Sequence, residues 1–300
     1  MDLSDFAHLW VLFSLASAFF HASRLAVTKR LAFSFSTEVL TLYVNLASLM
    51  VTLPLIIWHH NFPFQTPGYS MAVLWGGVIS GLGGWFVNAA LHRTEVSLVG
   101  PVMTLTPGFV IVIEWLLTGA LPGSLGVVGV LLLVMGGYIL SLSAEGSNWH
   151  RPLMRLLFDP GSLYATLAAA CFAGASVFGR IGIQLSDPLS FSVVVAVVNP
   201  LILWILFSLR DRKFNSRLLT PDLRRELRPL LLLGLLFALM RIADQIALSL
   251  TLASYAMAVK RTAGVFSVLL GRWFFAERYL ATKLLASVVM LLGVLALTQG

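Results

Sequence analysis

Long apolar runs follow one another along almost the whole chain, separated by short polar links. A helix needs about 20 apolar residues to cross the roughly 30 Å hydrocarbon core of a bilayer. Runs of this length predict ten membrane-spanning helices and leave no link long enough for a large soluble domain. The predicted spans are residues 9–28, 38–58, 71–91, 97–118, 125–143, 162–182, 189–209, 229–250, 254–275 and 280–298.

Composition agrees with this pattern and excludes a soluble globular protein, because 58% of the 300 residues are hydrophobic and only 11% are charged. The formal net charge of +7 comes largely from the links between apolar runs. Basic residues in such links typically flank a bilayer, so we expect the lipid bilayer and not nucleic acid as a partner. The single cysteine, Cys171, provides neither a disulfide framework nor a Cys-based metal site. We expect no metal and no cofactor.

The two halves of the chain are related by a shift of 157 residues. This shift aligns an A-L-x-x-T-x-x-S pattern at 90–97 with the same pattern at 247–254. It also superposes Gly77 on Gly234, Asn88 on Gln245, Phe109 on Phe266 and Gly136 on Gly293. Because each half has five spans, an odd number, the second half must enter the membrane from the opposite side. We therefore predict an all-α membrane protein with ten transmembrane helices in two inverted five-helix repeats, residues 1–143 and 162–300, joined by an interfacial connector, 144–161.

These features resemble the EamA-type members of the drug/metabolite transporter superfamily. The resemblance rests on the ten spans in two halves, on the repeated A-L-x-x-T-x-x-S, and on F-S-V-L-L-G running into Phe275-Ala276-Glu277. It covers nearly the whole chain, although Ala120 stands where the second half has Glu277. It implies a carrier and not an enzyme, and we expect an integral protein of a prokaryotic inner (plasma) membrane. The superfamily includes amino-acid and metabolite exporters, triose-phosphate translocators and nucleotide-sugar transporters, so the substrate stays open.

Polar residues inside the predicted spans recur at helical spacing. In the first span they occur at every third or fourth position and so share one face. The repeat-related faces of the third and eighth spans carry small residues, which favour close helix packing. Polar groups at mid-depth usually face protein or a water-filled cavity, so we predict a substrate site from these faces. Its candidate residues are His21 and Arg24 of the first span, Asn88 of the third, and Arg241, Asp244 and Gln245 of the eighth.

Lys260 and Arg261 stand side by side in the ninth span. The helical face of Lys260 carries small residues, so we expect its side chain to point into the bundle. Arg261 is rotated by about 100° and either faces a cavity or snorkels to the lipid headgroups. Each such charge near a helix centre costs about 2.5 to 3.5 kcal/mol on insertion scales, so the pair needs a partner. The pair looks like the Lys-Arg pair with which triose-phosphate translocators hold phosphate, and the resemblance implies an anion clamp.

A charge count gives the clamp a second argument. We expect Asp244 to orient Arg241 three residues before it, on the same helix face. Arg24, Arg241, Lys260 and Arg261 against Asp244 leave a formal surplus of +3, or +2 if Glu114 is included. A small organic anion, such as a phosphorylated metabolite, would supply the missing charge. The sequence thus predicts a secondary carrier that works by alternating access around a central basic cavity.

Three alternatives remain open. In the first, Arg241 pairs with Asp244, Arg24 and Arg261 face headgroups, and Lys260 is a gate partner of Glu114. In the second, the cations are paired with protein carboxylates and the carrier exports amino acids or drug-like metabolites. In the third, the same basic cavity opens sideways and flips a lipid with a phosphorylated headgroup.

Other residues are candidates for coupling and motion. The buried carboxylates Glu114 and Asp244 are possible coupling or gating groups, and the pattern does not separate coupling to protons from exchange against a counter-substrate. Pro101, Pro107 and Pro200 remove backbone hydrogen bonds at depth and are hinge candidates.

The distribution of basic residues predicts how the chain is oriented in the membrane. Basic residues concentrate in the links that follow odd-numbered spans, which places both termini outside the cytoplasm by the positive-inside rule. The family resemblance implies cytoplasmic termini instead.

No H-E-x-x-H, P-loop, dinucleotide fingerprint or G-x-S-x-G occurs, so we do not expect an enzyme.

Overall fold

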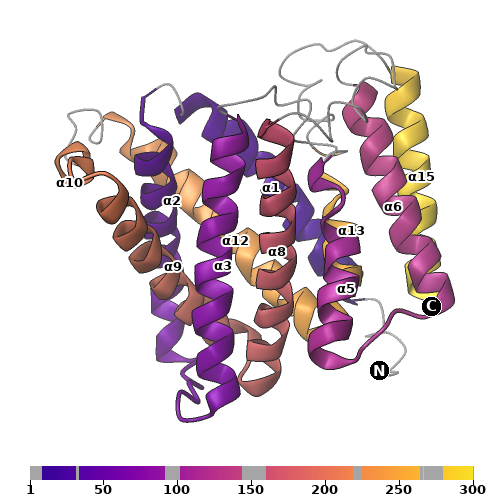
Figure 1. Ribbon diagram of the computed structural model, residues 1–300, viewed down its shortest axis with the longest axis horizontal. Coiled ribbons are helices and arrows are strands. Elements are labelled where there is room, and N and C mark those ends of the chain that lie inside the picture. Colours follow the sequence, from indigo (N-terminus) through magenta and orange to yellow (C-terminus); the bar gives the residue numbers. More distant parts are fainter. Residues whose placement is uncertain are drawn as a thin grey trace.

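A computed structural model describes residues 9–31, 34–91, 102–143, 160–218, 225–263, 266 and 280–299. Within these ranges all regular structure is helical, and the helices run up and down a single bundle (Figure 1). The first half contributes α1 (Leu9–Leu31), α2 (Thr37–Thr52) with the 3₁₀ turn η2 (Leu53–Ile57), α3 (Pro67–Leu91), α5 (Thr106–Thr118) and α6 (Ser124–Ser143). The second half contributes α8 (Pro160–Leu185), α9 (Pro188–Arg210), α10 (Phe214–Arg217), α12 (Leu227–Leu250), α13 (Ala253–Lys260) and α15 (Leu280–Gln299).

Each predicted span coincides with one of these helices over at least part of its length. In the described part of the chain, five helices are long and apolar enough to cross a membrane: Thr37–Ile57, Pro67–Val87, Gly161–Leu185, Pro188–Arg210 and Leu227–Leu250. Shorter apolar helices lie at Thr106–Thr118, Ser124–Ile139 and Val288–Gln299. The prediction of an all-helical membrane protein is confirmed, and the number of ten spans stays a prediction.

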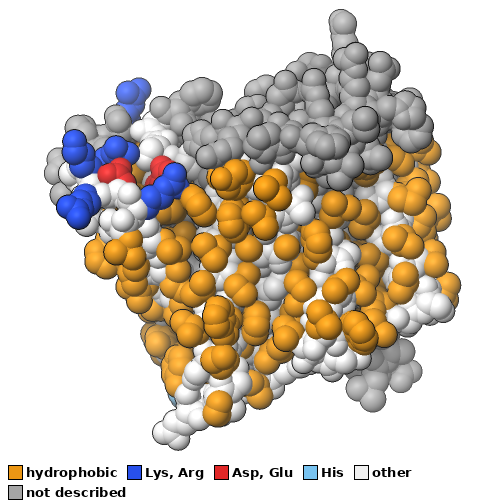
Figure 2. Space-filling view, in the orientation of Figure 1, with side chains coloured by type: hydrophobic (Ala, Val, Ile, Leu, Met, Phe, Trp, Pro, Cys, Tyr) orange, Lys and Arg blue, Asp and Glu red, His pale blue; other side chains and the backbone are white. Residues whose placement is uncertain are grey.

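The outside of the bundle is apolar and much of its polar content is inside. Large hydrophobic side chains such as Met50, Leu116 and Leu209 are exposed. Figure 2 shows hydrophobic side chains spread over most of the visible face of the bundle. Hydroxyl groups such as those of Ser17 and Ser190 are fully buried. This arrangement is the one that a hydrocarbon solvent favours, because polar groups that face lipid find no hydrogen-bond partner.

The two halves pack against each other in pairs that respect the repeat. Helix α1 of the first half packs on α12 of the second half. Their repeat-related counterparts, α8 of the second half and α3 of the first, likewise pack on each other. Helices that are repeat-related also meet: α2 contacts α9, α5 contacts α13, and α6 contacts α15. Such reciprocal pairing is the arrangement expected of an inverted repeat with a pseudo-two-fold axis.

Two repeat-related glycines sit at repeat-related helix crossings. A Cβ atom on Gly77 of α3 would lie 2.9 Å from Val198 Cγ1 of α9. A Cβ atom on Gly234 of α12 would lie 2.7 Å from the carbonyl carbon of Ala47 in α2. Both separations are too short, so these positions need glycine to let the backbones approach. Helix packing therefore accounts for Gly77 and Gly234.

The fourth and ninth predicted spans are interrupted at the same place in the repeat. Turns at 104–105 and 261–262 are separated by the repeat shift of 157 residues. Pro107 has no N–H for the carbonyl of Met103, and the Thr106 hydroxyl donates to that carbonyl instead at 2.7 Å. Likewise the Thr262 hydroxyl donates to the carbonyl of Val259 at 2.8 Å. The predicted span 254–275 thus has a turn at residues 261–262, as the span 97–118 has at 104–105, while 264–265 and 267–275 lie outside the described residues.

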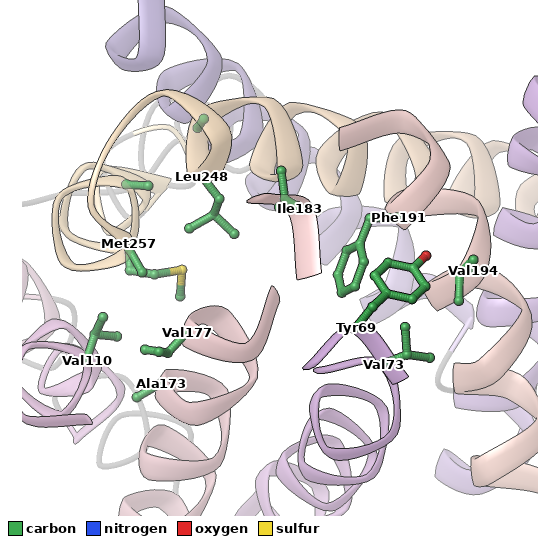
Figure 3. Close-up of a cluster of buried hydrophobic side chains, with 13 residues drawn as sticks. Tyr69, Val73, Val110, Ala173, Val177, Ile183, Phe191, Val194, Leu248 and Met257 are labelled. Atoms are coloured by element: carbon green, nitrogen blue, oxygen red, sulfur yellow. The ribbon is translucent and has the colours of Figure 1, made fainter. Parts of the chain in front are cut away.

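A hydrophobic core joins the halves at the lower end of the view in Figure 1. It is built from α3, α5, α8, α9, α12 and α13, and Figure 3 shows Tyr69, Phe191, Val177 and Met257 among its side chains. Tyr69 and Phe191 pack edge to face with ring centroids 6.1 Å apart. This core fixes the position of the helix ends that carry the polar network described below.

Candidate functional site

Helices α1 and α12 meet along the predicted polar face of the first span. The two helices are antiparallel, so successive contacts involve rising residue numbers in α1 and falling residue numbers in α12. Ser17 Oγ donates to Asp244 Oδ1 at 2.5 Å, and one turn later His21 Nδ1 lies 3.4 Å from Met240 Sδ. Near the other end of the seam the guanidinium of Arg24 lies over the ring of Phe237, 4.8 Å from its centroid. The polar face of α1 is therefore turned toward protein.

Asp244 is the carboxylate at the centre of this seam. Besides the hydroxyl of Ser17 it accepts a hydrogen bond from Lys260 Nζ, which makes an ion pair between α12 and α13. The side chain of Lys260 is 15% exposed and that of Asp244 is 20% exposed, so the pair is not fully buried. The expected orienting contact between Asp244 and Arg241 is not formed.

Arg241 points elsewhere because two other groups hold it. Its guanidinium lies over the ring of Phe237 one turn earlier, 4.7 Å from the centroid, and its Nη2 donates to Asn45 Oδ1 of α2 at 3.3 Å. Arg24 and Arg241 thus share one aromatic ring. Attraction between a cation and a ring face contributes about 0.5 to 2 kcal/mol, but it leaves the N–H groups in the guanidinium plane to find other partners.

Several polar atoms of this region are buried and have no hydrogen-bond partner among the described residues. They are Arg24 Nε, Arg241 Nη1, Arg261 Nε and Gln245 Oε1. Buried polar groups are normally hydrogen-bonded. These three N–H groups and one amide oxygen are therefore available to bind a ligand. The Nε of Arg261 is buried, while the residue as a whole is half-buried. Lys260 ends α13 and Arg261 caps it, a position where helix carbonyl groups favour cations.

The remaining predicted residues are more scattered. Gln245 lies in α12 and faces α8, because its Oε1 would lie 3.9 Å from a Cβ atom added to Gly179. Asn88 lies in α3, but its side chain is outside the described part of the structure, as is Pro101. Pro107 stands in the first turn of α5, just after the interruption, whereas α9 continues through Pro200. Substrate contact and hinge roles for these residues stay predictions.

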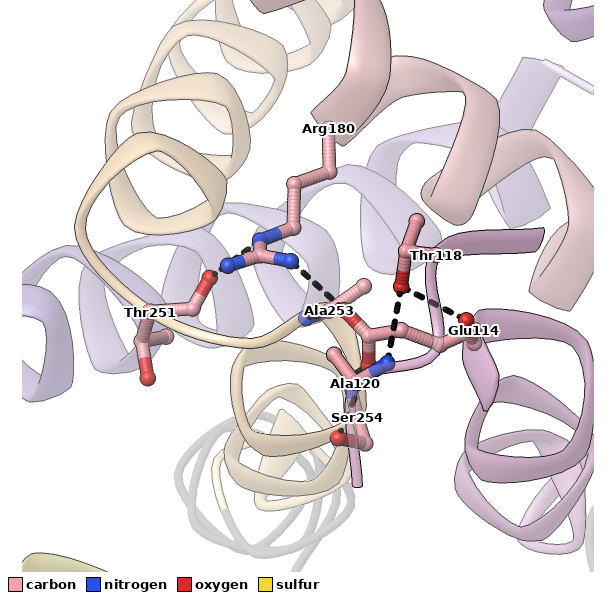
Figure 4. Close-up of polar contacts among 7 residues, drawn as sticks. All are labelled: Glu114, Thr118, Ala120, Arg180, Thr251, Ala253 and Ser254. Carbon is pink, nitrogen blue, oxygen red and sulfur yellow. Dashed lines mark hydrogen bonds and ion pairs between the residues drawn. The ribbon is translucent and has the colours of Figure 1, made fainter. Parts of the chain in front are cut away.

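Glu114 of α5 is the centre of a second polar network, drawn in Figure 4. Its fully buried carboxylate accepts from the backbone N–H groups of Ala253 and Ser254 at 2.9 and 3.1 Å, and from the Ser254 hydroxyl at 3.1 Å. Arg180 of α8 completes the site with an ion pair at 3.1 Å. In this structure Glu114 pairs with Arg180, and Lys260 pairs with Asp244 in place of the Glu114 partner that the first alternative gave it.

Arg180 is held by both helices that it bridges. Its Nε donates to the carbonyl of Thr251 at the end of α12 at 2.9 Å, while its Nη1 reaches Glu114. The signal that it belongs to a site was its position inside the predicted span 162–182, where a cation needs a buried partner. Asn45 and Phe237 gave no comparable signal.

Across the described ranges, no three His, Cys, Asp or Glu residues are grouped so that they could hold a metal ion. The candidate site is thus made of cations, one carboxylate, an aromatic ring and hydroxyl groups. That donor set suits an anion far better than a metal.

Comparison with known proteins places the chain. A family model described as the EamA-like transporter family matches residues 8–142 and, a second time, residues 159–299. The chain belongs to the EamA-like transporter family. It is accordingly a membrane transporter with a two-repeat architecture. This membership agrees with the expectation that the chain is not an enzyme.

Similarity to individual proteins is lower. No curated protein matches this EamA-like transporter in sequence. A solved structure titled only "Crystal structure of protein" superposes with a TM-score of 0.73 at 17% identity, and the match covers 97% of this chain and 96% of that chain. At this identity the likeness shows the fold alone.

Proposed function

We propose that this EamA-like transporter is a secondary carrier for a small organic anion, such as a phosphorylated metabolite, and that it works by alternating access. The observation that carries the proposal is the set of buried guanidinium N–H groups without partners on Arg24, Arg241 and Arg261. An anion that enters between α1, α12 and α13 would accept hydrogen bonds from them.

Charge supports the same substrate class. Among the described residues, the four cations Arg24, Arg241, Lys260 and Arg261 are faced by the single carboxylate of Asp244, a formal surplus of three. Burial of unpaired charge is strongly unfavourable, so a site of this kind is stabilised when its ligand brings negative charge. A phosphate or dicarboxylate would bring one to two negative charges and several acceptor oxygens.

The residues have distinct roles in this proposal. Arg24, Arg241 and Arg261 would bind the anion through their planar N–H groups, while Lys260 would act as a point charge. Asp244 forms an ion pair with Lys260. In this proposal the ion pair would break when the anion enters and binds Lys260. His21, which faces Met240 beside these cations, would be a further donor. Asn88 and Gln245 stay candidate ligands.

A thermal-shift panel on the purified protein tests the proposal. The probes are inorganic phosphate, a triose phosphate, a dicarboxylate, a neutral amino acid and an organic cation. A ligand at about 100 times its dissociation constant stabilises by roughly 2.7 kcal/mol, and we expect this from an anion only. Arg241→Gln should abolish the response. Arg210→Gln is the matched control, because Arg210 also lies over an aromatic ring, 5.0 Å from the centroid of Trp85, but outside the site.

One observation favours a second candidate. The amino-acid or drug-exporter alternative predicts that the cations are paired with protein carboxylates, and Lys260 is paired with Asp244. A pair of opposite charges suits the carboxylate and ammonium of a zwitterion. Stabilisation by a neutral amino acid, with no response to phosphate or the dicarboxylate, would favour this candidate over the anion carrier.

A further inference from the structure

The second polar network joins helices from both halves at one end of the bundle. Glu114 belongs to α5, Arg180 to α8, Thr251 follows α12, and Ala253 and Ser254 begin α13. Figure 4 shows the carboxylate between the Arg180 guanidinium and the first residues of α13. In the view of Figure 1 this end is the lower one, where α5 and α12 end and α13 begins.

The bonds of Glu114 cannot be replaced while this end stays packed. The first N–H groups of a helix have no partner within the helix, and Glu114 satisfies those of Ala253 and Ser254. The Glu114 side chain is only 1% exposed, so water does not compete effectively for its carboxylate oxygens, although Arg180 keeps an exposure of 18%. If α5 moved away from α13, Glu114, Arg180 and two backbone N–H groups would have to be hydrated together.

We propose that Glu114 and Arg180 form a latch, defined as these two side chains with Thr251, Ala253 and Ser254, that holds this end of the carrier closed and opens during transport. The inference rests on the alternating-access carrier proposed above. In such carriers the repeats rock against each other, so that contacts closing one end break when the other end closes.

The latch is also asymmetric. The repeat shift of 157 residues takes Glu114 to Gly271, which has no side chain to accept a hydrogen bond. When the repeats exchange conformations, the opposite end therefore cannot be closed by the same set of bonds. The latch favours the state seen here, closed at the lower end of Figure 1, and so biases the equilibrium between the two facing states.

The two ends of α13 connect the latch with the proposed anion site. Its first residues bind Glu114, and its last residue, Lys260, pairs with Asp244. An α-helix of eight residues is about 12 Å long and moves as a rigid unit. Opening of the latch would therefore displace Lys260 relative to α12, which links access at one end to the geometry of the site.

The test measures opening directly by double electron–electron resonance. Spin labels are placed on Leu121→Cys after α5 and Ser249→Cys near the end of α12, both exposed, in a Cys171→Ser background that removes the native thiol. Arg180→Gln is the main variant, since it removes the ion pair but leaves the three other donors to Glu114. Glu114→Gln is the second. We expect each to increase the population with a longer label distance by about tenfold, which corresponds to 1.4 kcal/mol.

Asp187→Asn is the matched control. Asp187 also caps a helix with its carboxylate, accepting from Leu189 N at 3.0 Å and Ser190 N at 2.9 Å of α9, but its cap is local. It should leave the distances unchanged. Should either latch variant fail to fold, the other decides, and Ser254→Ala, which removes one hydroxyl donor, serves as a milder third variant that must shift the distances in the same direction.

Unchanged distances in folded Arg180→Gln or Glu114→Gln would overturn the latch and leave Glu114 a structural cap. The same samples are titrated with inorganic phosphate, the triose phosphate and the dicarboxylate in thermal-shift measurements. Longer distances without any anion response would support the latch and contradict the anion carrier. An anion response with unchanged distances would contradict the latch alone.

Discussion

Lys260 and Asp244 form an ion pair that ties the last residue of α13 to the middle of α12. The same carboxylate accepts from Ser17 of α1, so one side chain connects three helices. Under the anion-carrier function proposed above, Asp244 is an internal counter-ion that the substrate anion would displace from Lys260. The competition gives the first prediction.

Asp244→Asn should tighten the binding of an anion while it destabilises the protein. Loss of the counter-ion leaves Lys260 free for the ligand, and we expect the dissociation constant for the stabilising anion to fall by about tenfold. Without ligand, the unpaired ammonium should lower the free energy of unfolding by about 1 to 3 kcal/mol, less than for a fully buried pair because both groups keep some exposure.

Isothermal titration and thermal unfolding of the same samples measure both effects. Asp211→Asn is the control, because its ion pair with Arg217 at 3.3 Å is well exposed and should contribute little. Weaker anion binding by Asp244→Asn would contradict the counter-ion role and favour a zwitterionic substrate whose ammonium needs this carboxylate.

Phe237→Leu should weaken anion binding by about three- to thirtyfold. The ring lies beneath both Arg24 and Arg241, and its removal costs two cation–π contacts that hold the guanidinium groups in place. Isothermal titration with the anion that gives the largest thermal shift measures the change. Phe64→Leu, which alters an exposed ring outside the site, should leave the affinity unchanged; equal losses in both variants would refute a specific role for Phe237.

Gly234→Ala should destabilise the protein by about 1 to 3 kcal/mol, because the added methyl group would overlap with α2 at Ala47. Thermal unfolding in detergent measures the effect. Gly84→Ala is the control, since an added Cβ there meets nothing within 4 Å and alanine favours the helix. A stable Gly234→Ala variant would show that α2 and α12 are free to separate.

The charged end of the molecule predicts the orientation. Blue side chains gather at the upper left of Figure 2, where Figure 1 labels α10, and this end lies opposite to the end where α15 terminates. The exposed basic residues just before α10 are Arg210, Arg212 and Lys213. By the positive-inside rule this end faces the cytoplasm. A reporter that fluoresces only in the cytoplasm, fused after residue 300, should therefore stay dark. A bright fusion would show that the family resemblance, which implies cytoplasmic termini, is the better guide.

The sequence by itself determined the all-helical membrane fold and the family. Apolar runs long enough for a bilayer leave the chain little choice, because a backbone in hydrocarbon must satisfy its own hydrogen bonds. The repeat was also visible, since Gly77 and Gly234 keep their places under one shift. Polar spacing on α1 was sufficient to place Ser17 and His21 on a face turned toward protein.

Only the tertiary structure decided which charges meet. Helical spacing suggested that Asp244 would pair with Arg241, but α13 brings Lys260 to that carboxylate, and Phe237 and Asn45 hold Arg241 elsewhere. Glu114 and Arg180 are likewise joined through three helix ends that are far apart in the sequence. Coulomb attraction depends on distance in space and on burial, and helix crossings set both. Periodicity along one helix contains neither quantity.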